Sequence, residues 1–205
     1  MKAARHPPGR AGQPWLAHRL EVARRGADVL DEKRRALLRE RARLQPLATK
    51  GRRDWERRAR EAETWLQRAA ILGGERSLEA ASDAVAERSL VEVKWRQILG
   101  TRCPSEPTVS LPDASLSMLG GSSALLCAAE AHRNALESAA RFATMRSALE
   151  RIENELELTR RRSNAVEHRW IPRHERALAA LDLSLEELER EDATRVRWVT
   201  RNDGR

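Results

Sequence analysis

Apolar residues recur at alternating three- and four-residue steps over two long stretches of the chain, about 14–72 and about 142–199. This spacing predicts two long helices that meet along a narrow seam. Because both stretches lie in one chain, with a different kind of segment between them, we expect an antiparallel coiled coil that folds back on itself. The predicted seam includes Leu16, Leu20, Ala27, Leu30 and Leu37 in the first helix and Leu149, Ile152, Leu156, Val166 and Trp170 in the second.

The segment between the two helices has another pattern. Gly73-Gly74 should break the first helix, and a short amphipathic helix is expected from Ser77 to Glu87. From Val91 to Ile98 apolar and polar residues alternate with the period of a strand, and Pro107–Leu111 is a second candidate strand. Cys103 and Pro104 are expected in the loop between them. Such a small β-hairpin is marginal alone, so it must lean on the helices or on another protein.

These patterns predict a mainly α protein: a long antiparallel two-helix coiled coil, with a short helix and a small β-hairpin inserted at the folded-back end. We expect five segments, which are a mobile basic arm (1–13), an N-terminal shaft helix (14–72), the insert (73–123), a C-terminal shaft helix (124–199) and a tail (200–205).

Each long helix contains one proline, Pro46 in the first and Pro172 in the second. A proline inside a helix removes a backbone hydrogen bond and favours a bend. If residues 14 and 199 lie at the same end of the pair, Pro46 faces about residue 167. The two prolines would then bend the coiled coil at nearly one level.

Charge is distributed unevenly along the chain. The formal net charge of the 205 residues is +8. Residues 14–70 contain 16 Lys or Arg and 9 Asp or Glu, whereas residues 142–199 contain 11 and 12. The densely charged helices can be explained as solvated faces, but the excess on the arm and the first helix favours an acidic partner, for which nucleic acid is one candidate.

The chain lacks the motifs of common catalytic and cofactor sites. No GxxxxGK[ST] loop is present, and Gly120-Gly121-Ser122-Ser123 lacks the phosphate-binding lysine. The two cysteines fit no metal or disulfide pattern, and the five histidines include no pair at i, i+4 spacing. We therefore predict no catalytic, cofactor-binding or metal-binding residues and no nucleotide binding. No apolar run is long enough to span a bilayer, and no secretory signal is seen, so a cytoplasmic protein is expected.

Two motifs, near opposite ends of the chain, resemble those of a known family. The first is Pro8-Gly9-Arg10-Ala11-Gly12, followed by Leu16-x3-Leu20 and by Arg24-Arg25-Gly26-Ala27-Asp28-Val29-Leu30-Asp31-Glu32-Lys33-Arg34. The second is Thr159-Arg160-Arg161-Arg162-Ser163-Asn164-Ala165-Val166-Glu167 with Ile171-Pro172, and then Leu185-Glu186-Glu187-x-Glu189-Arg190-Glu191. In this order they resemble the terminal helices of the D subunit of the V/A-type ATPases, the rotor shaft of the central stalk. The family commonly has Lys at the positions of Arg162 and Arg195, and Val at that of Ser163.

The resemblance implies a non-catalytic rotor subunit that couples ATP synthesis or hydrolysis to proton or sodium transport. Its implied partners are the catalytic A and B subunits (the A3B3 hexamer), the F subunit of the stalk and the C/d-type socket subunit on the membrane rotor. The implied location is peripheral, at the cytoplasmic face of the membrane, with no specific nucleic-acid binding. We expect the A3B3 contacts to involve Arg24, Arg25, Lys33, Arg34 and Arg35.

Other classes of protein fit parts of the pattern. A basic coiled-coil scaffold or nucleic-acid-binding protein would explain the charge, and it predicts steeply salt-dependent binding to duplex DNA. An enzyme is disfavoured because no site is found. A generic coiled-coil dimer explains neither the insert nor the paired terminal motifs.

Overall fold

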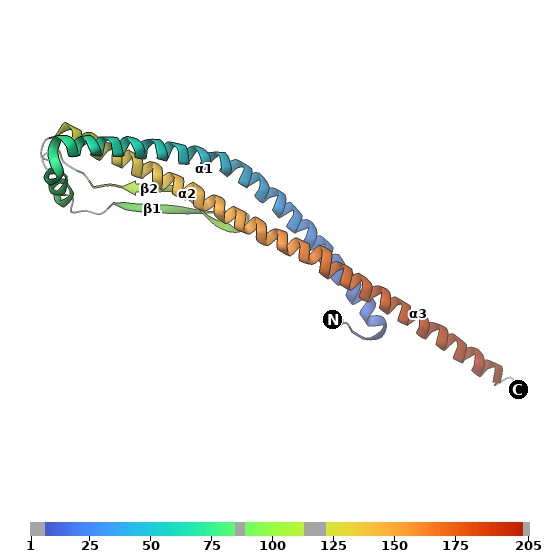
Figure 1. The fold of residues 1–205 in the computed structure, drawn as a ribbon. Coiled ribbons are helices and arrows are strands. Elements are labelled where there is room, and N and C mark those ends of the chain that lie inside the picture. The colour runs from blue at the N-terminus through green and yellow to red at the C-terminus, as the bar shows by residue number, and fades with distance from the viewer. Residues whose placement is uncertain (1–6, 85–88, 113–121, 203–205) are drawn as a thin grey trace. The chain divides into compact units, whose positions relative to one another are not determined.

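The computed structural model describes residues 7–84, 89–112 and 122–202 of the chain. A short 3-10 turn, Gly9–Ala11, leads into the long helix α1 (Gly12–Ala84). The hairpin strands β1 (Leu90–Ile98) and β2 (Thr101–Ser110) follow, and the helix α2 (Ser123–Ala165) continues through a π-helical turn (Val166–Trp170) into α3 (Ile171–Asn202) (Figure 1). The predicted fold class, two long helical stretches with a small antiparallel hairpin between them, is confirmed.

The chain is organised as two compact units. The terminal unit combines the first 35 residues with residues 157–205, and the hairpin unit is Ala36–Leu156. In the terminal unit, Arg24 pairs with Glu175 and Arg10 with Glu189, so α1 and α3 run antiparallel there. In the hairpin unit, Arg58 near the middle of α1 reaches the Asn134 carbonyl of α2, while Leu37 packs with Ile152. The helices of this unit are therefore also antiparallel.

The predicted register between the helices is wrong. The Arg24–Glu175 contact places residue 14 at the level of about residue 185, where residue 199 was expected. Likewise, the neighbours of Pro46, Leu44 and Leu47, line a hollow with Thr144 and Ala148, far along the chain from residue 167. A slide by whole heptads keeps every apolar residue on the seam, so periodicity alone cannot fix the register.

The two prolines are accommodated in different ways. The helix α1 continues through Pro46. Pro172 comes directly after the π-helical turn, so its missing backbone N–H falls where the regular i, i+4 hydrogen-bond pattern of the helix is already interrupted. Pro46 belongs to the hairpin unit and Pro172 to the terminal unit. A bend at either proline stays a prediction.

The Gly73-Gly74 break is present as a local interruption of α1. Gly74 has φ 72° and ψ 168°, a conformation that is essentially restricted to glycine. Helical structure resumes and ends at Ala84, and the last part of the expected short helix, residues 85–88, lies outside the described residues. The Ser77 hydroxyl donates to the Gly74 carbonyl across the interruption at 3.1 Å.

The strand β2 is longer than predicted, because Cys103 and Pro104 lie within it and not in a loop. Only Leu99 and Gly100 form the turn, and both have positive φ (51° and 83°), as a tight two-residue hairpin turn requires. Trp95 is paired with Pro104, and the register shifts between Val93 and Trp95. Prolines are tolerated at such irregularities, where the regular ladder is interrupted, and the sequence pattern did not reveal this one.

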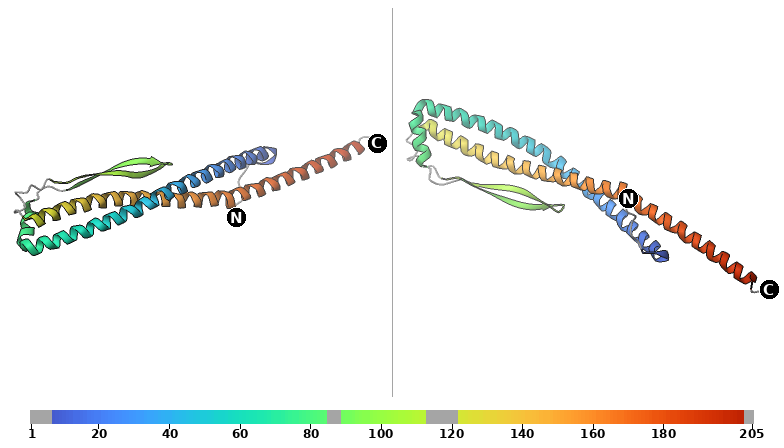
Figure 2. Two further views of the ribbon diagram at one scale, coloured as in Figure 1. Left: turned by 90° about the horizontal axis from the view of Figure 1, so that it is seen from above. Right: turned by 60° about the horizontal axis from the view of Figure 1, so that its bottom comes forward.

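The core of the hairpin unit is narrow and forms two clusters. The first joins both helices to β2 and consists of Leu37, Leu44, Cys103, Ala148 and Ile152. The second lies near the Gly74 interruption and consists of Ala69, Ala81, Ala124, Leu125 and Ala128. Two views show the hairpin lying along α2 in this unit (Figure 1 and Figure 2). The predicted seam residues Leu16, Leu20, Ala27, Leu37 and Ile152 are buried, and Leu30, Leu149, Leu156, Val166 and Trp170 are half-buried.

Replacing Ile152 with Ala should test the first cluster. Ile152 is fully buried, so the Ile152→Ala change should lower the free energy of unfolding by about 2–5 kcal/mol. Leu158→Ala on the same helix removes an exposed side chain and should change it by less than about 1 kcal/mol. Urea unfolding followed by circular dichroism measures both. Equal effects of the two changes would contradict this description of the core.

Candidate interaction surfaces

In the terminal unit the seam between α1 and the C-terminal helix is lined by small side chains. Ala27 on α1 is buried, as are Thr159 and Ser163 on α2. The Ser163 hydroxyl donates to Glu167 Oε1 at 2.7 Å, one turn further on. Small residues let two helix backbones approach closely, so little apolar area is available here for stability.

A stack of aromatic rings and one guanidinium adds further contacts in this unit. Arg19 Cζ lies 4.8 Å from the Trp15 ring centroid and 5.7 Å from that of Trp170. Trp170 stacks on the buried His174, with ring centroids 3.6 Å apart, and His174 Nδ1 lies 2.9 Å from the Trp170 carbonyl oxygen. Trp170 ends the π-helical turn, so the extra residue of that turn helps to set its position. The stack joins α1 to the C-terminal helix.

The five residues expected to contact A3B3 all lie on α1, and the arginines among them are engaged within the chain. Arg24 reaches across to Glu175 at 2.7 Å, and Arg25 pairs with Glu21 at 3.2 Å. Arg34 and Arg35 both bind Asp31, at 2.7 and 2.5 Å. Lys33 is half-buried, whereas the four arginines are exposed.

These ion pairs leave donors for a partner. Asp31 has a lowered pKa, first because Arg34 donates a hydrogen bond to it and also because Arg35 lies close. A guanidinium has five N–H donors, and a single carboxylate uses only some of them. The arginines therefore lie on an exposed part of α1 with hydrogen-bonding capacity to spare.

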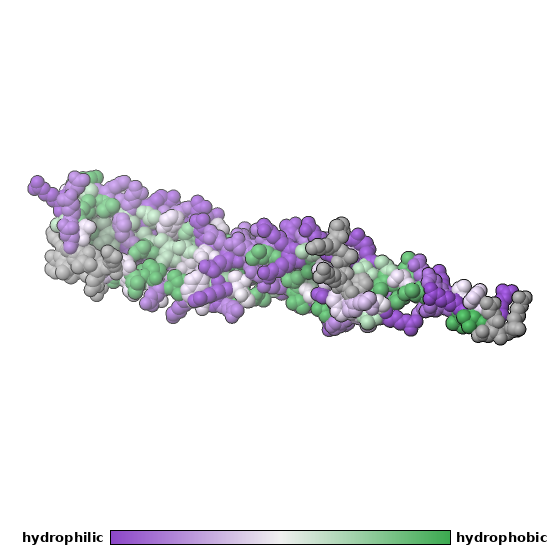
Figure 3. Space-filling view, turned by 90° about the horizontal axis from the view of Figure 1, so that it is seen from below, coloured by the Kyte–Doolittle hydropathy of each residue, from purple (hydrophilic) through white to green (hydrophobic). Residues whose placement is uncertain are grey.

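The last turns of α3 expose several large apolar side chains. Arg10, beside the start of α1, pairs with Glu189, so α3 continues from there to Asn202 beyond the beginning of α1. Val196, Trp198 and Val199 lie on this extension, and Trp198 is 67% exposed. Figure 3 shows small groups of hydrophobic residues among hydrophilic ones on the face that it presents. Apolar residues gathered at one end are typical of an interaction site.

The hairpin is fastened to both helices of its unit by charged and aromatic contacts. The Trp95 ring on β1 has two guanidinium neighbours, Arg102 of β2 and Arg151 of α2, each with Cζ 4.9 Å from the ring centroid. Arg151 also donates to the Arg102 carbonyl at 3.4 Å. Because Arg151 belongs to α2, this cluster holds the hairpin against that helix.

Glu40 links the hairpin to α1 through an ion pair. Glu40 Oε1 lies 2.6 Å from Arg43 on its own helix and 3.6 Å from Arg96 on β1. The Arg43 hydrogen bond is the main cause that lowers the pKa of the Glu40 carboxyl, and Arg96 adds to it. Beneath these charges, Cys103 of β2 is fully buried, and burial raises the pKa of its thiol.

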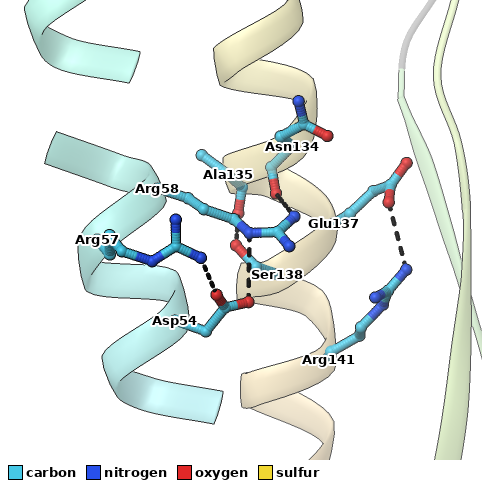
Figure 4. Close-up of polar contacts among 8 residues, drawn as sticks. All are labelled: Asp54, Arg57, Arg58, Asn134, Ala135, Glu137, Ser138 and Arg141. Atoms are coloured by element: carbon cyan, nitrogen blue, oxygen red, sulfur yellow. Dashed lines mark hydrogen bonds and ion pairs between the residues drawn. The ribbon is translucent and has the colours of Figure 1, made fainter. Parts of the chain in front are cut away.

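Further along the hairpin unit the helices are linked by a polar contact (Figure 4). Asp54 Oδ1 binds Arg57 at 2.5 Å, and its other oxygen binds Arg58 at 3.2 Å. Arg58 in turn donates to the Asn134 carbonyl of α2 at 3.4 Å. Trp55 stacks on Phe142 of α2, with ring centroids 5.6 Å apart.

Sequence reasoning did not find the Arg19 stack, the Trp95 cluster or the role of Glu40. The positions of Trp15 and Arg19, one helical turn apart, were a usable signal on α1. The contacts of Trp95 and Glu40 depend on docking of the hairpin, which the pattern does not specify. Among residues 7–84, 89–112 and 122–202, no group of three His, Cys, Asp or Glu side chains is placed to hold a metal ion. None of the helices described here is long and apolar enough to cross a membrane.

Comparison with known proteins gives consistent matches over nearly the whole chain. Residues 15–201 match the family model for the ATP synthase D subunit. The D subunit of the A-type ATP synthase from Pyrococcus horikoshii is 32% identical over 188 residues, which are 90% of this chain and 88% of that protein. That of Methanopyrus kandleri is 33% identical over 90% of this chain and 81% of its own length. The Halorubrum lacusprofundi protein is 27% identical over 94% and 86%.

The Glu40 contact predicts a pH-dependent stability. Since its folded-state pKa lies below the ordinary value of 4.5, Glu40 stabilises the fold above about that pH, and this contribution is lost as the pH falls through the lowered pKa. Glu40→Gln should therefore lower the free energy of unfolding by about 1 kcal/mol at pH 7 and by nothing once the wild-type carboxyl is protonated. Urea unfolding at several pH values measures this difference.

The matched control is Glu56→Gln, which breaks the more exposed Arg52–Glu56 pair within α1. Its effect should stay below about 0.5 kcal/mol at pH 7. If Glu40→Gln and Glu56→Gln behave alike at every pH, Glu40 does not fasten the hairpin.

The aromatic stack predicts a specific role for the Arg19 charge. Arg19→Met keeps a long apolar side chain but removes the cation, so it should destabilise the protein by about 0.5–2 kcal/mol. Arg19→Lys keeps a cation and should recover part of the loss. Thermal unfolding followed by circular dichroism measures the midpoint, and an unchanged midpoint for Arg19→Met would refute the role.

Proposed function

This chain belongs to the ATP synthase D-subunit family and is a central-stalk subunit of an A/V-type ATP synthase; from that premise we propose that it is the rotor shaft of the complex. In this role it couples ATP synthesis or hydrolysis in the A3B3 hexamer to proton or sodium transport through the membrane rotor. The chain itself is non-catalytic and sits peripherally at the cytoplasmic face of the membrane.

The extension of α3 is the observation that best supports this role. Beyond the Arg10–Glu189 contact, α3 has no described partner from α1, and it ends with exposed Val196, Trp198 and Val199. A helix end whose apolar side chains have no partner among the described residues fits a cavity formed by other subunits. We assign that cavity to the centre of the A3B3 hexamer.

The exposed arginines of α1 fit contacts at the rim of the same cavity. Arg24, Arg25, Arg34 and Arg35 are exposed on α1, and Lys33 lies among them. Unequal contacts around the helix pair would favour a different set of catalytic interfaces at each rotational position. Torque is then transmitted by differences in contact energy, because a contact shifts an equilibrium only by its differential affinity for the two states.

The hairpin unit supplies a candidate surface for the other partners. Ile71 and Leu72 precede the Gly74 interruption and are 83% and 74% exposed. An apolar pair at the folded-back end suits docking on the socket subunit, and the F subunit of the stalk would bind the same unit. A basic scaffold or nucleic-acid-binding role is not favoured, because the match to the D-subunit family extends over residues 15–201 and includes both helical terminal motifs.

Co-expression with the A, B and F subunits from the same source tests the proposal. We expect about one copy of this chain for each A3B3 hexamer after affinity purification, in keeping with a single central shaft, and an ATPase activity that changes when the chain is omitted. Failure to co-purify, together with salt-sensitive retention of nucleic acid, would instead support the basic scaffold.

A pair of single substitutions locates the contact. Trp198→Ser should weaken association with the A3B3 hexamer by about tenfold, because it removes a large apolar side chain from the α3 extension. Leu136→Ser changes another exposed side chain, 39% accessible, in the hairpin unit and should leave that association within about threefold of the wild type. Equal association of both variants would place the contact elsewhere.

A further inference from the structure

A short part of α1 carries most of the charge excess of the chain. Residues 39–60 contain nine Lys or Arg and only three Asp or Glu, within a protein of formal net charge +8. All three acidic residues are already ion-paired within the chain. Glu40 binds Arg43 and Arg96, Asp54 binds Arg57 and Arg58, and Glu56 binds Arg52. The remaining cations of this segment therefore have no carboxylate within it to neutralise them.

Five basic residues form one line along the solvent side of this segment, which we call the basic stripe: Arg39, Lys50, Arg53, Arg57 and Arg60. From Lys50 onward they are spaced by three or four residues, so they share one face of the helix. Buried Leu44, Ala48 and Ala62 occupy the opposite face. All five stripe residues are exposed, and within the described residues only Arg57 of the five has an ion pair.

The stripe has an open hollow near its centre. It is lined by Ala42, Gln45, Pro46, Thr49, Lys50 and Arg53. Pro46 has no backbone N–H to donate to the carbonyl four residues before it, and the Thr49 hydroxyl donates to the Gln45 carbonyl at 3.0 Å. A ridge of another protein could enter between the cations and contact the small apolar side chains of Ala42 and Pro46.

We propose that the basic stripe is a docking surface for an acidic protein surface on another subunit of the same complex. The proposal rests on the proposed function, which surrounds the chain with other subunits. Uncompensated positive charge selects an anionic partner. The hollow favours a protein over a polyphosphate backbone or a lipid headgroup, since only a protein surface combines carboxylates with side chains that fill it. From Arg39 to Arg60 the stripe extends over about 32 Å at 1.5 Å per residue, enough for several contacts.

Exposed charge pairs are individually weak and act mainly on the rate and the salt dependence of association. The stripe should therefore speed and orient docking while other surfaces supply most of the affinity. Removing its charge should be visible as a weaker dependence of binding on ionic strength.

Two charge-reversal variants at the same level of the hairpin unit test the proposal. The Lys50→Glu, Arg53→Glu double variant reverses the charge at the centre of the stripe. Arg141→Glu with Arg146→Glu makes the same change in net charge on α2, where Phe142 and Met145 adjoin Gly51 of α1. Both pairs of residues are exposed, and their variants are compared only after circular dichroism and unfolding midpoints show that they fold as the wild type does.

The probes are a purified assembly of the A, B, F and socket subunits made without this chain, a duplex DNA, and vesicles that contain phosphatidylserine. We expect wild-type binding to the protein assembly to weaken with added salt. The stripe variant should bind about tenfold more weakly at low salt and show a shallower salt dependence, while the α2 variant stays within about threefold of the wild type.

The outcomes separate this inference from the proposed function. If wild-type chain does not bind the assembly at all, both fail. If it binds and the two variants match it, the stripe is only a solvated face and this inference alone is overturned. If charge reversal affects DNA or vesicle binding and leaves the protein assembly unaffected, the partner is a polyanion or a membrane and the inference is again overturned.

Discussion

The hairpin unit depends on one buried cluster, in which Cys103 of β2 packs with residues of both helices, among them Leu37 of α1 and Ile152 of α2. Two helices alone form only a narrow line of buried side chains, and a two-stranded hairpin alone is marginal in water. Because a buried side chain of β2 packs against both helices, the hairpin and the helices have one common core. Glu40 and Arg151 then hold its edges with charge, so hairpin and helices form one compact unit.

A narrow core also determines the character of the surface. Most positions on the long helices face water, and the chain fills them with charged residues that pair mainly at i, i+3 or i, i+4. Such pairs keep helices soluble but add little stability. Two surfaces therefore differ from this pattern of paired charges. They are the apolar extension of α3 and the part of α1 where cations outnumber carboxylates.

The sequence was sufficient to predict the helices, the break at Gly74 and the existence of the hairpin, because each has a local cause. The helices follow from heptad spacing, the break from the pair of glycines, and the hairpin from the alternation that begins at Val91. The sequence did not predict that Arg24 would meet Glu175, since sliding by whole heptads leaves the pattern unchanged. Cys103 and Pro104 were expected in the loop between the strands, but they lie in β2, and the register shift next to Pro104 depends on the partner strand. The contact between Trp95 and Arg151 could not be predicted for the same reason, because Arg151 is 56 positions away in the sequence. The expected contacts of Arg24, Arg25, Lys33, Arg34 and Arg35 with A3B3 stay predictions.

Under the proposed function, the two unusual surfaces make different kinds of contact, and a rotating subunit needs both. The apolar side chains of Val196 and Trp198 gain free energy from burial without a directional requirement, so their contacts can persist while the subunit turns inside a cavity. The cations of the basic stripe lie on one face of α1, and each ion pair that they form is weak. Water and salt screen the interactions of these cations beyond about 10 Å. Contacts of this kind form and break at little cost, yet they distinguish one face of α1 from the others. Burial of the apolar end of α3 would thus keep the shaft in place. The charge on α1 would make a neighbouring subunit bind one face of that helix in preference to the others.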